Sequence, residues 1–169
     1  TDGGFTGEIF PVNPAADEVL GRRCWPSLTA IGRPVDLVIV AVPAAAVEQV
    51  TAEAAEVGCG ALLIVSSGFA EVGPAGAERE RRLVTTARNN GMRIVGPNAF
   101  GLVNTDPSVQ LRALFLPITP TPGPVGIIRS CRITGRKSRA GFRRHSGPTR
   151  THIGTDSGGA RSANGSQHA

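Results

Sequence analysis

Four short apolar runs along the first hundred residues each end in a cluster of Pro, Gly, Ser or Asn. They lie in the segments Ile9–Pro14, Val38–Pro43, Leu62–Phe69 and Met92–Asn98. A β-branched run interrupted by such residues is typical of a buried parallel strand that opens into a loop. In an open α/β sheet these loops gather at one edge, where ligands bind. The sequence therefore predicts four candidate binding loops at one edge of a single sheet.

Helical patterns separate the predicted strands. This alternation indicates right-handed crossovers and an α/β fold, a Rossmann-like parallel sheet with helices on both faces. A helix begins after Pro43 and stops at Gly58, and Ser27 can cap a brief helix before Gly32. The remaining predicted elements are strands at Glu8–Val12, Val35–Val42, Ala61–Ser66 and Met92–Val95, a short helical turn at Pro14–Gly21, and a helix at Ala75–Asn90.

The beginning of the chain lacks the usual first unit of such a sheet. A doubly wound domain normally starts with a strand, a glycine-rich phosphate loop and a helix. Here the paired glycines of Thr1–Gly4 are typical of the end of a helix. We therefore expect an N-terminally incomplete domain whose sheet lacks its first strand.

Charge divides the chain at about residue 126. Residues 1–126 carry nine arginines and twelve carboxylates, a net charge of −3, whereas residues 127–169 carry nine Lys/Arg and one carboxylate, a net charge of +8. The second segment has too few large apolar side chains to offset its chain entropy. We expect an N-terminally incomplete domain at 1–126 and a basic, low-complexity, disordered tail at 127–169. With only Phe142 available for base stacking, the tail disfavours a nucleic-acid partner.

Cysteine usage and hydropathy indicate where in the cell such a chain would reside. Cys24, Cys59 and Cys131 are odd in number and form no CxxC pair, which disfavours a disulfide framework and a metal site. Free thiols suit a reducing, cytoplasmic location. No apolar run approaches the ~20 residues of a membrane span, so we expect no membrane association.

Several motifs occur together in a recognisable order. They resemble the CoA-binding, Rossmann-like domain of NDP-forming acyl-CoA synthetases, relatives of the succinyl-CoA synthetase alpha subunit. The resemblance covers about residues 3–126 and implies a domain that lays CoA across the carboxyl edge of its strands. The motifs that carry it are Pro11–Pro14, Trp25–Leu28, Val42–Pro43, Ser66–Glu71, Gly96–Gly101 and Asn104–Thr105.

Matching this family residue by residue implies a set of CoA contacts. These run from the adenosine end of CoA, along its nucleotide and pantetheine, to the thiol end. The matching residues are Asn13 and Pro14 at the adenosine end, Val42 and Pro43 beside nucleotide and pantetheine, Ser66, Ser67 and Gly68 at the pantetheine arm, and Asn98 at the thiol end.

The resemblance ends after Pro122–Gly126. There the family continues into a flavodoxin-like domain, and its phosphate-carrying histidine lies further on. The histidines of this chain, at 145, 152 and 168, match none of its positions. The change of composition favours out-of-frame translation of a GC-rich gene. We expect a CoA-holding part without catalytic residues, whose complete parent would use ATP or GTP and add flavodoxin-like and ATP-grasp domains or subunits.

Two other functions stay open at this point. The same module could serve as a CoA-binding regulatory domain of a fused protein acetyltransferase. The other is an NAD(H)-binding Rossmann domain. Such a domain normally carries an acidic residue for the ribose hydroxyls at this strand end, whereas the first predicted strand here ends in Val12–Pro14, which disfavours NAD(H). Gly68 and Gly96 can also be read as simple turn glycines, Glu71 as a solvated acid, and Arg79–Arg82 as a solvated helix face.

Overall fold

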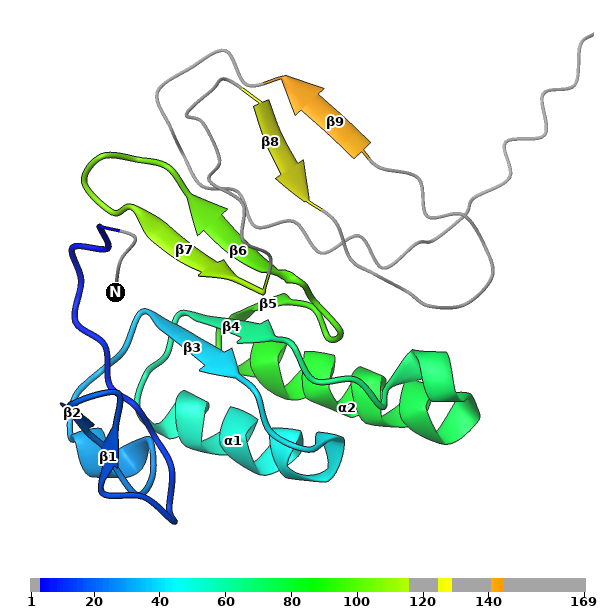
Figure 1. The fold of residues 1–169 in the computed structure, drawn as a ribbon. Helices are drawn as coiled ribbons and strands as arrows, with labels where there is room; N and C mark the ends of the chain where they lie inside the picture. Colours follow the sequence, from blue (N-terminus) through cyan, green and yellow to red (C-terminus); the bar gives the residue numbers. More distant parts are fainter. Residues whose placement is uncertain (1–3, 116–124, 129–140, 145–169) are drawn as a thin grey trace, which may run out of the picture.

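A three-stranded parallel sheet forms the centre of the computed structural model, which describes residues 4–115, 125–128 and 141–144. Its strands are β3 (Leu37–Val40), β4 (Ala61–Ile64) and β5 (Arg93–Val95), hydrogen-bonded in that order (Figure 1). Each of the three lies within a predicted strand. The parallel α/β class is confirmed.

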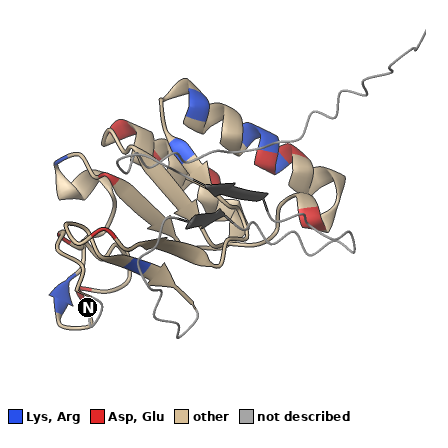
Figure 2. Cartoon of the chain, turned by 90° about the horizontal axis from the view of Figure 1, so that it is seen from above, with Lys and Arg blue, Asp and Glu red and all other residues tan. Residues whose placement is uncertain are grey.

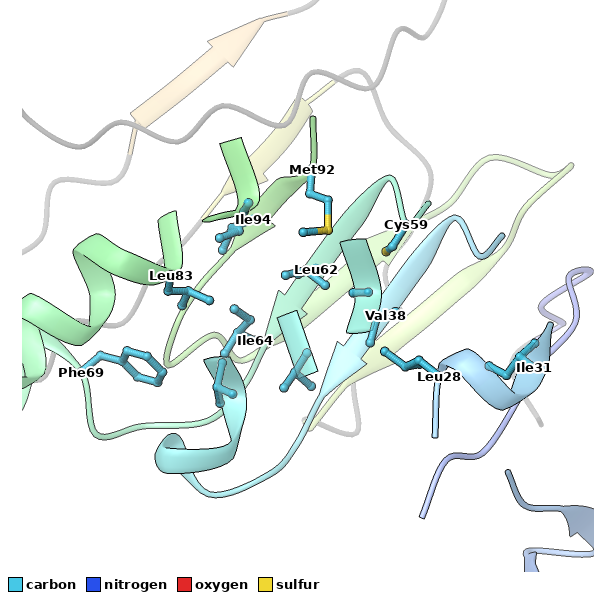
Figure 3. Packing of buried hydrophobic residues seen from close by; sticks show 14 residues of the cluster. Leu28, Ile31, Val38, Cys59, Leu62, Ile64, Phe69, Leu83, Met92 and Ile94 are labelled. Carbon is cyan, nitrogen blue, oxygen red and sulfur yellow. The ribbon is translucent and has the colours of Figure 1, made fainter. Parts of the chain in front are cut away.

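Two helices connect these strands and share one face of the sheet. Helix α1 (Ala44–Glu56) follows β3, and helix α2 (Pro74–Asn89) follows β4. The two helices contact each other and the sheet, as Figures 1 and 2 show from two directions. Alternate strand residues point toward them and form the core (Figure 3). The most buried members of this core are Val40, Val47, Ala54, Leu62, Ile64, Phe69, Leu83 and Ala87.

The opposite face of the sheet is covered differently from the prediction. Both α-helices of the described residues lie on the first face, and a hairpin of β6 (Gly101–Asn104) and β7 (Leu111–Leu114) lies over the second. Ile39 points to this second face and is 48% exposed. A shallow depression of about 210 Å³ separates it from β7. Nothing in the sequence pattern predicted this hairpin.

The predicted strand at Glu8–Val12 does not form. Only Val12 makes a β-bridge, parallel to Trp25, and the segment pairs with none of the three central strands. Phe10 and Trp25 instead pack edge to face at 6.5 Å against the margin of the core. The physical reason is the lack of a neighbour: among the described residues, no strand offers this segment a continuous row of backbone partners.

The predicted helical turn at Pro14–Gly21 is also wrong. The structure has a small antiparallel hairpin of β1 (Glu18–Val19) and β2 (Arg22–Arg23). Leu20 and Gly21 between them have φ angles of 51° and 74°. Two consecutive left-handed residues are typical of a tight hairpin turn and do not fit a right-handed helix.

The brief helix after Ser27 forms as expected. A 3₁₀ turn spans Thr29–Ile31, and the Ser27 hydroxyl accepts a hydrogen bond from the Ala30 N–H at 3.1 Å. Gly32 ends the turn with a left-handed φ of 73°. Five residues then lead to β3.

The predicted disordered tail at 127–169 falls largely outside the described residues. What the structure describes at this end is an antiparallel pair, β8 (Val125–Ile128) with β9 (Gly141–Arg144). The domain boundary at residue 126 stays a prediction. In the described part of the chain, no helix is both long enough and apolar enough to cross a membrane.

Candidate functional site

Three loops follow the carboxyl ends of the three central strands. They are Val42–Pro43 after β3, Ser66–Phe69 after β4 and Gly96–Ala99 after β5, and we call them the strand-end loops. The strands are parallel, so the loops lie at one edge of the sheet, where ligands of open α/β folds bind. Three of the four predicted loops therefore lie at a common edge.

Hydrogen bonds centred on Ser66 tie the strand-end loops together. The Ser66 hydroxyl donates to the Val42 carbonyl at 2.5 Å, and the Ser66 carbonyl accepts from the Asn98 N–H at 2.9 Å. The Ala99 N–H donates to the Ile64 carbonyl at 3.2 Å. The three loops are thus one connected backbone surface, and the Ser66 hydroxyl is already used within it.

The glycines of the strand-end loops are required by the fold itself. Gly68 has a φ of +101°, and a Cβ there would lie 2.9 Å from the Cβ of Ala44, the first residue of α1. Gly96 has a φ of +105°, and a Cβ there would lie 2.3 Å from the Ile64 carbonyl oxygen. Both close approaches are intramolecular. They support the interpretation of Gly68 and Gly96 as glycines that allow the loops to pack.

Ser67, Pro43 and Asn98 differ in how far the strand-end loops expose them. Ser67 and Pro43 are exposed, and among the described residues the Ser67 hydroxyl has no hydrogen-bond partner. Asn98 is half-buried and left-handed, with a φ of 55°, a conformation that Asn adopts more readily than most residues. The strand-end loops therefore expose the Ser67 hydroxyl and carry a half-buried amide side chain at Asn98.

Asn13 and Pro14 form a separate exposed turn. The Asn13 Oδ1 accepts from the Ala15 N–H at 2.9 Å, a local turn that Asn side chains commonly make. The Asn13 N–H donates to the Trp25 carbonyl at 2.9 Å. Within the described residues, no recorded hydrogen bond joins this turn to the strand-end loops.

The segment next to this turn is anchored at the far end of α1. The Leu28 N–H donates to Glu53, in the last turn of the helix, at 3.3 Å. Val42–Pro43, by contrast, lie directly before the first turn. The helix has 13 residues and is therefore about 20 Å long. The structure brings six of the eight predicted contact residues to one edge and leaves Asn13 and Pro14 apart from them.

Glu71 is not the solvated acid that the sequence suggested. Its carboxylate accepts hydrogen bonds from the Gly68 N–H and, at 3.1 Å, from the Phe69 N–H. Burial raises the pKa of Glu71, but hydrogen bonds from the backbone N–H groups of Gly68, Glu71 itself and Phe69 outweigh it, so the pKa lies below its ordinary value. The carboxylate is ionised at neutral pH and fixes the loop. An acid two or three residues after a glycine turn is the sequence signal that could have revealed this.

Helix α2 contributes two more charged side chains to the same loop. Arg79 donates to the Gly68 carbonyl, and Glu80 accepts from the Ala70 N–H at 3.1 Å. The interpretation of Arg79–Arg82 as a solvated face holds for Arg82, an exposed residue that pairs with Glu48 of α1 at 2.8 Å. It is wrong for Arg79. Figure 2 shows both signs of charge gathered on one stretch of α2.

Other candidate chemistry is scarce in the described part of the chain. It holds no group of three His, Cys, Asp or Glu side chains arranged for a metal ion. Cys24 and Cys59 are free and buried, and burial is the main cause that raises the pKa of the Cys59 thiol. Arg23 stacks over Trp25, 4.5 Å from the ring centroid.

Two solved structures from archaea are similar to this chain. The chain is 37% identical to the dinucleotide-forming acetyl-coenzyme A synthetase 1 of Candidatus Korarchaeum cryptofilum, solved with phosphate and ADP, with a TM-score of 0.63. The match covers 69% of this chain and 24% of that one. A protein from Pyrococcus horikoshii gives a TM-score of 0.64 at 35% identity.

Sequence comparisons agree. The chain is 46% identical to the ADP-forming acetate–CoA ligase II of Archaeoglobus fulgidus and 42% identical to the alpha subunit of ADP-forming acetate–CoA ligase I of Pyrococcus furiosus. Each match covers 74% of this chain, which spans 18% and 28% of those relatives' lengths. The family model for the CoA binding domain matches residues 5–105. This chain belongs to the CoA-binding domain family, and the part of each ligase that it matches is similar to it in sequence.

Proposed function

We propose that this chain holds CoA at the strand-end loops, as the CoA-binding part of an ADP-forming acyl-CoA synthetase. The observation that carries the proposal is the connected edge formed by Val42–Pro43, Ser66–Phe69 and Gly96–Ala99, which lies inside the family match at residues 5–105. Ser67 and Asn98 supply polar side chains there. Val42 and Pro43 supply an apolar wall.

The roles of the individual residues follow the edge from β3 to β5. Pro43 and Val42 contact the nucleotide and pantetheine. Ser66, Ser67 and Gly68 line the pantetheine arm, where the Ser67 hydroxyl meets its amides, and Asn98 orients the thiol end. Asn13 and Pro14 take the adenosine end. Because their turn is not hydrogen-bonded to the strand-end loops, these two contacts have the least structural support.

The larger protein would join CoA to a small carboxylic acid with cleavage of ATP to ADP. Support comes from the relatives, which are named acetate–CoA ligases and ADP-forming. That reaction needs a phosphate-carrying histidine and a nucleotide-binding domain, which the flavodoxin-like and ATP-grasp parts of the parent would supply. The chain alone binds CoA and forms no thioester. A ligase is favoured over an acetyltransferase regulator or an NAD(H)-binding domain, because ligases are the relatives found.

Two measurements on the 169-residue chain test this proposal. Calorimetric titration should give CoA binding at least tenfold tighter than NADH binding, and tighter binding of NADH would contradict it. A coupled assay with acetate, CoA and ATP should give no thioester above the blank. Turnover by the purified chain would show that it carries catalytic residues.

A further inference from the structure

Three charged side chains occupy the polar backbone groups of the loop after β4. Glu71 accepts from the Gly68 and Phe69 N–H groups, and Glu80 accepts from the Ala70 N–H. Arg79 donates to the Gly68 carbonyl. We call Glu71, Arg79 and Glu80 the charged clamp. Three consecutive N–H donors and the carbonyl among them are thus satisfied by side chains.

The loop and the helix that carry the charged clamp are packed firmly against each other. Phe69 is fully buried in the core, which anchors the loop from below. A Cβ at Gly76, in the first turns of α2, would lie 1.8 Å from the Phe69 carbonyl oxygen, so the helix backbone lies directly against the loop. Two members of the clamp project from this helix. A side chain held by a packed helix positions its partner more precisely than one held by a loop.

The clamp decides what this loop can offer a ligand. Successive backbone N–H groups in a turn normally form a concave site for an anion such as a phosphate. Here the carboxylate of Glu71 already fills that site, so the loop keeps its shape without a ligand. Ser67, on the outer side of the same loop, stays exposed. A binding loop that is ordered beforehand avoids the ordering cost that a flexible one incurs on binding.

We propose that Glu71, Arg79 and Glu80 are positioning residues that pre-organise the Ser66–Phe69 loop for the neutral pantetheine part of CoA. They touch the loop and not the ligand. This inference rests on the proposed function. It adds that the affinity for CoA depends on charged side chains behind the loop, whereas the affinity for the nucleotide part alone does not.

The test uses two ligands and three variants of the full chain. CoA carries the pantetheine arm, and adenosine 3′,5′-bisphosphate carries only nucleotide and phosphates. Glu71→Gln weakens the clamp at its centre, and Glu80→Gln weakens it from α2 should the first variant fold poorly. Glu56→Gln is the matched control, because Glu56 is exposed at the end of α1 with no recorded hydrogen bond.

We expect Glu71→Gln and Glu80→Gln to bind CoA about tenfold more weakly, a change of ~1.4 kcal/mol, and the bisphosphate as the parent does. Glu56→Gln should match the parent for both ligands. A general loss of structure would weaken both ligands together, so equal losses would overturn the inference, as would unchanged CoA binding. If the parent chain does not bind CoA at all, the proposed function fails first and this inference falls with it.

Discussion

The strand-end loops and the N-terminal hairpin are held in different ways. The loops after β3, β4 and β5 are joined by backbone hydrogen bonds around Ser66, next to a fully buried Phe69. The hairpin of β1 and β2 has only exposed residues in its strands and one two-residue pairing. Parallel pairing of buried strands therefore holds the strand-end loops, whereas a short local turn holds the N-terminal hairpin. The two halves should respond differently to substitution.

The largest contrast is expected between two left-handed glycines. Gly96→Ala places a Cβ 2.3 Å from the Ile64 carbonyl oxygen, and we expect a loss of about 3 kcal/mol in the free energy of unfolding. Gly21→Ala in the hairpin meets nothing within 4 Å and should cost only about 1 kcal/mol, for its left-handed φ. Urea unfolding of both variants measures this. Equal losses would show that the two regions are equally constrained.

Substitutions of two asparagines test whether CoA contacts the strand-end loops more closely than the N-terminal turn. Asn98→Gly removes the amide but keeps a residue suited to the left-handed backbone, and we expect CoA binding to weaken by about 1–2 kcal/mol. Asn13→Gly, in the exposed turn, should weaken it less, because that turn is not joined to the strand-end loops. Calorimetry with CoA measures both. A larger effect at Asn13 would move the main contacts to the N-terminal turn.

Two adjacent serines of one loop should differ in role: Ser66 stabilises the loop, and Ser67 contacts CoA. Ser66→Ala leaves the Val42 carbonyl without its donor, so unfolding should become easier by about 1 kcal/mol. Ser67→Ala removes an exposed hydroxyl and should leave the free energy of unfolding unchanged while it weakens CoA binding. Chemical unfolding and ligand titration are both needed. The reverse pattern would assign the ligand contact to Ser66.

The smallest effect concerns pH. The pKa of Glu71 is lower in the folded chain than its ordinary value, so its ionised form stabilises the fold above the ordinary pKa. That contribution is lost as the pH falls through the lowered folded value. The stability difference between the parent and Glu71→Gln should therefore be largest near neutral pH and shrink in acid. A difference that grows in acid would contradict the hydrogen bonds assigned to this carboxylate.

Local sequence signals predicted the elements that local physics determines. Helix α1 begins directly after Pro43 and α2 ends one residue before Asn90, because Pro and Asn-Gly act within a turn or two of their own positions. The three central strands were predicted within about two residues, since continuous apolar runs that end in turn residues are typical of parallel strands. The edge that carries the candidate site follows from those strands alone.

The wrong predictions concern segments whose structure depends on a partner distant in the sequence or on a single backbone dihedral angle. The Glu8–Val12 segment has strand-like residues, but whether it pairs depends on a neighbour that no local pattern specifies. Leu20 adopts a left-handed φ of 51°, a conformation that a leucine in the sequence does not predict. Arg79 contacts Gly68, eleven residues earlier, so its role depends on how α2 folds back onto the loop.

Hydrogen–deuterium exchange of the 169-residue chain, with and without saturating CoA, tests the central claim most directly. We predict that CoA slows exchange most at the amides of residues 66–70 and 98–99, with smaller changes across residues 18–23 of the hairpin. The first set marks the connected edge of β4 and β5, and the second marks the locally held region. Protection confined to the hairpin, or equal in both sets, would contradict the assignment of the CoA site to the strand-end loops.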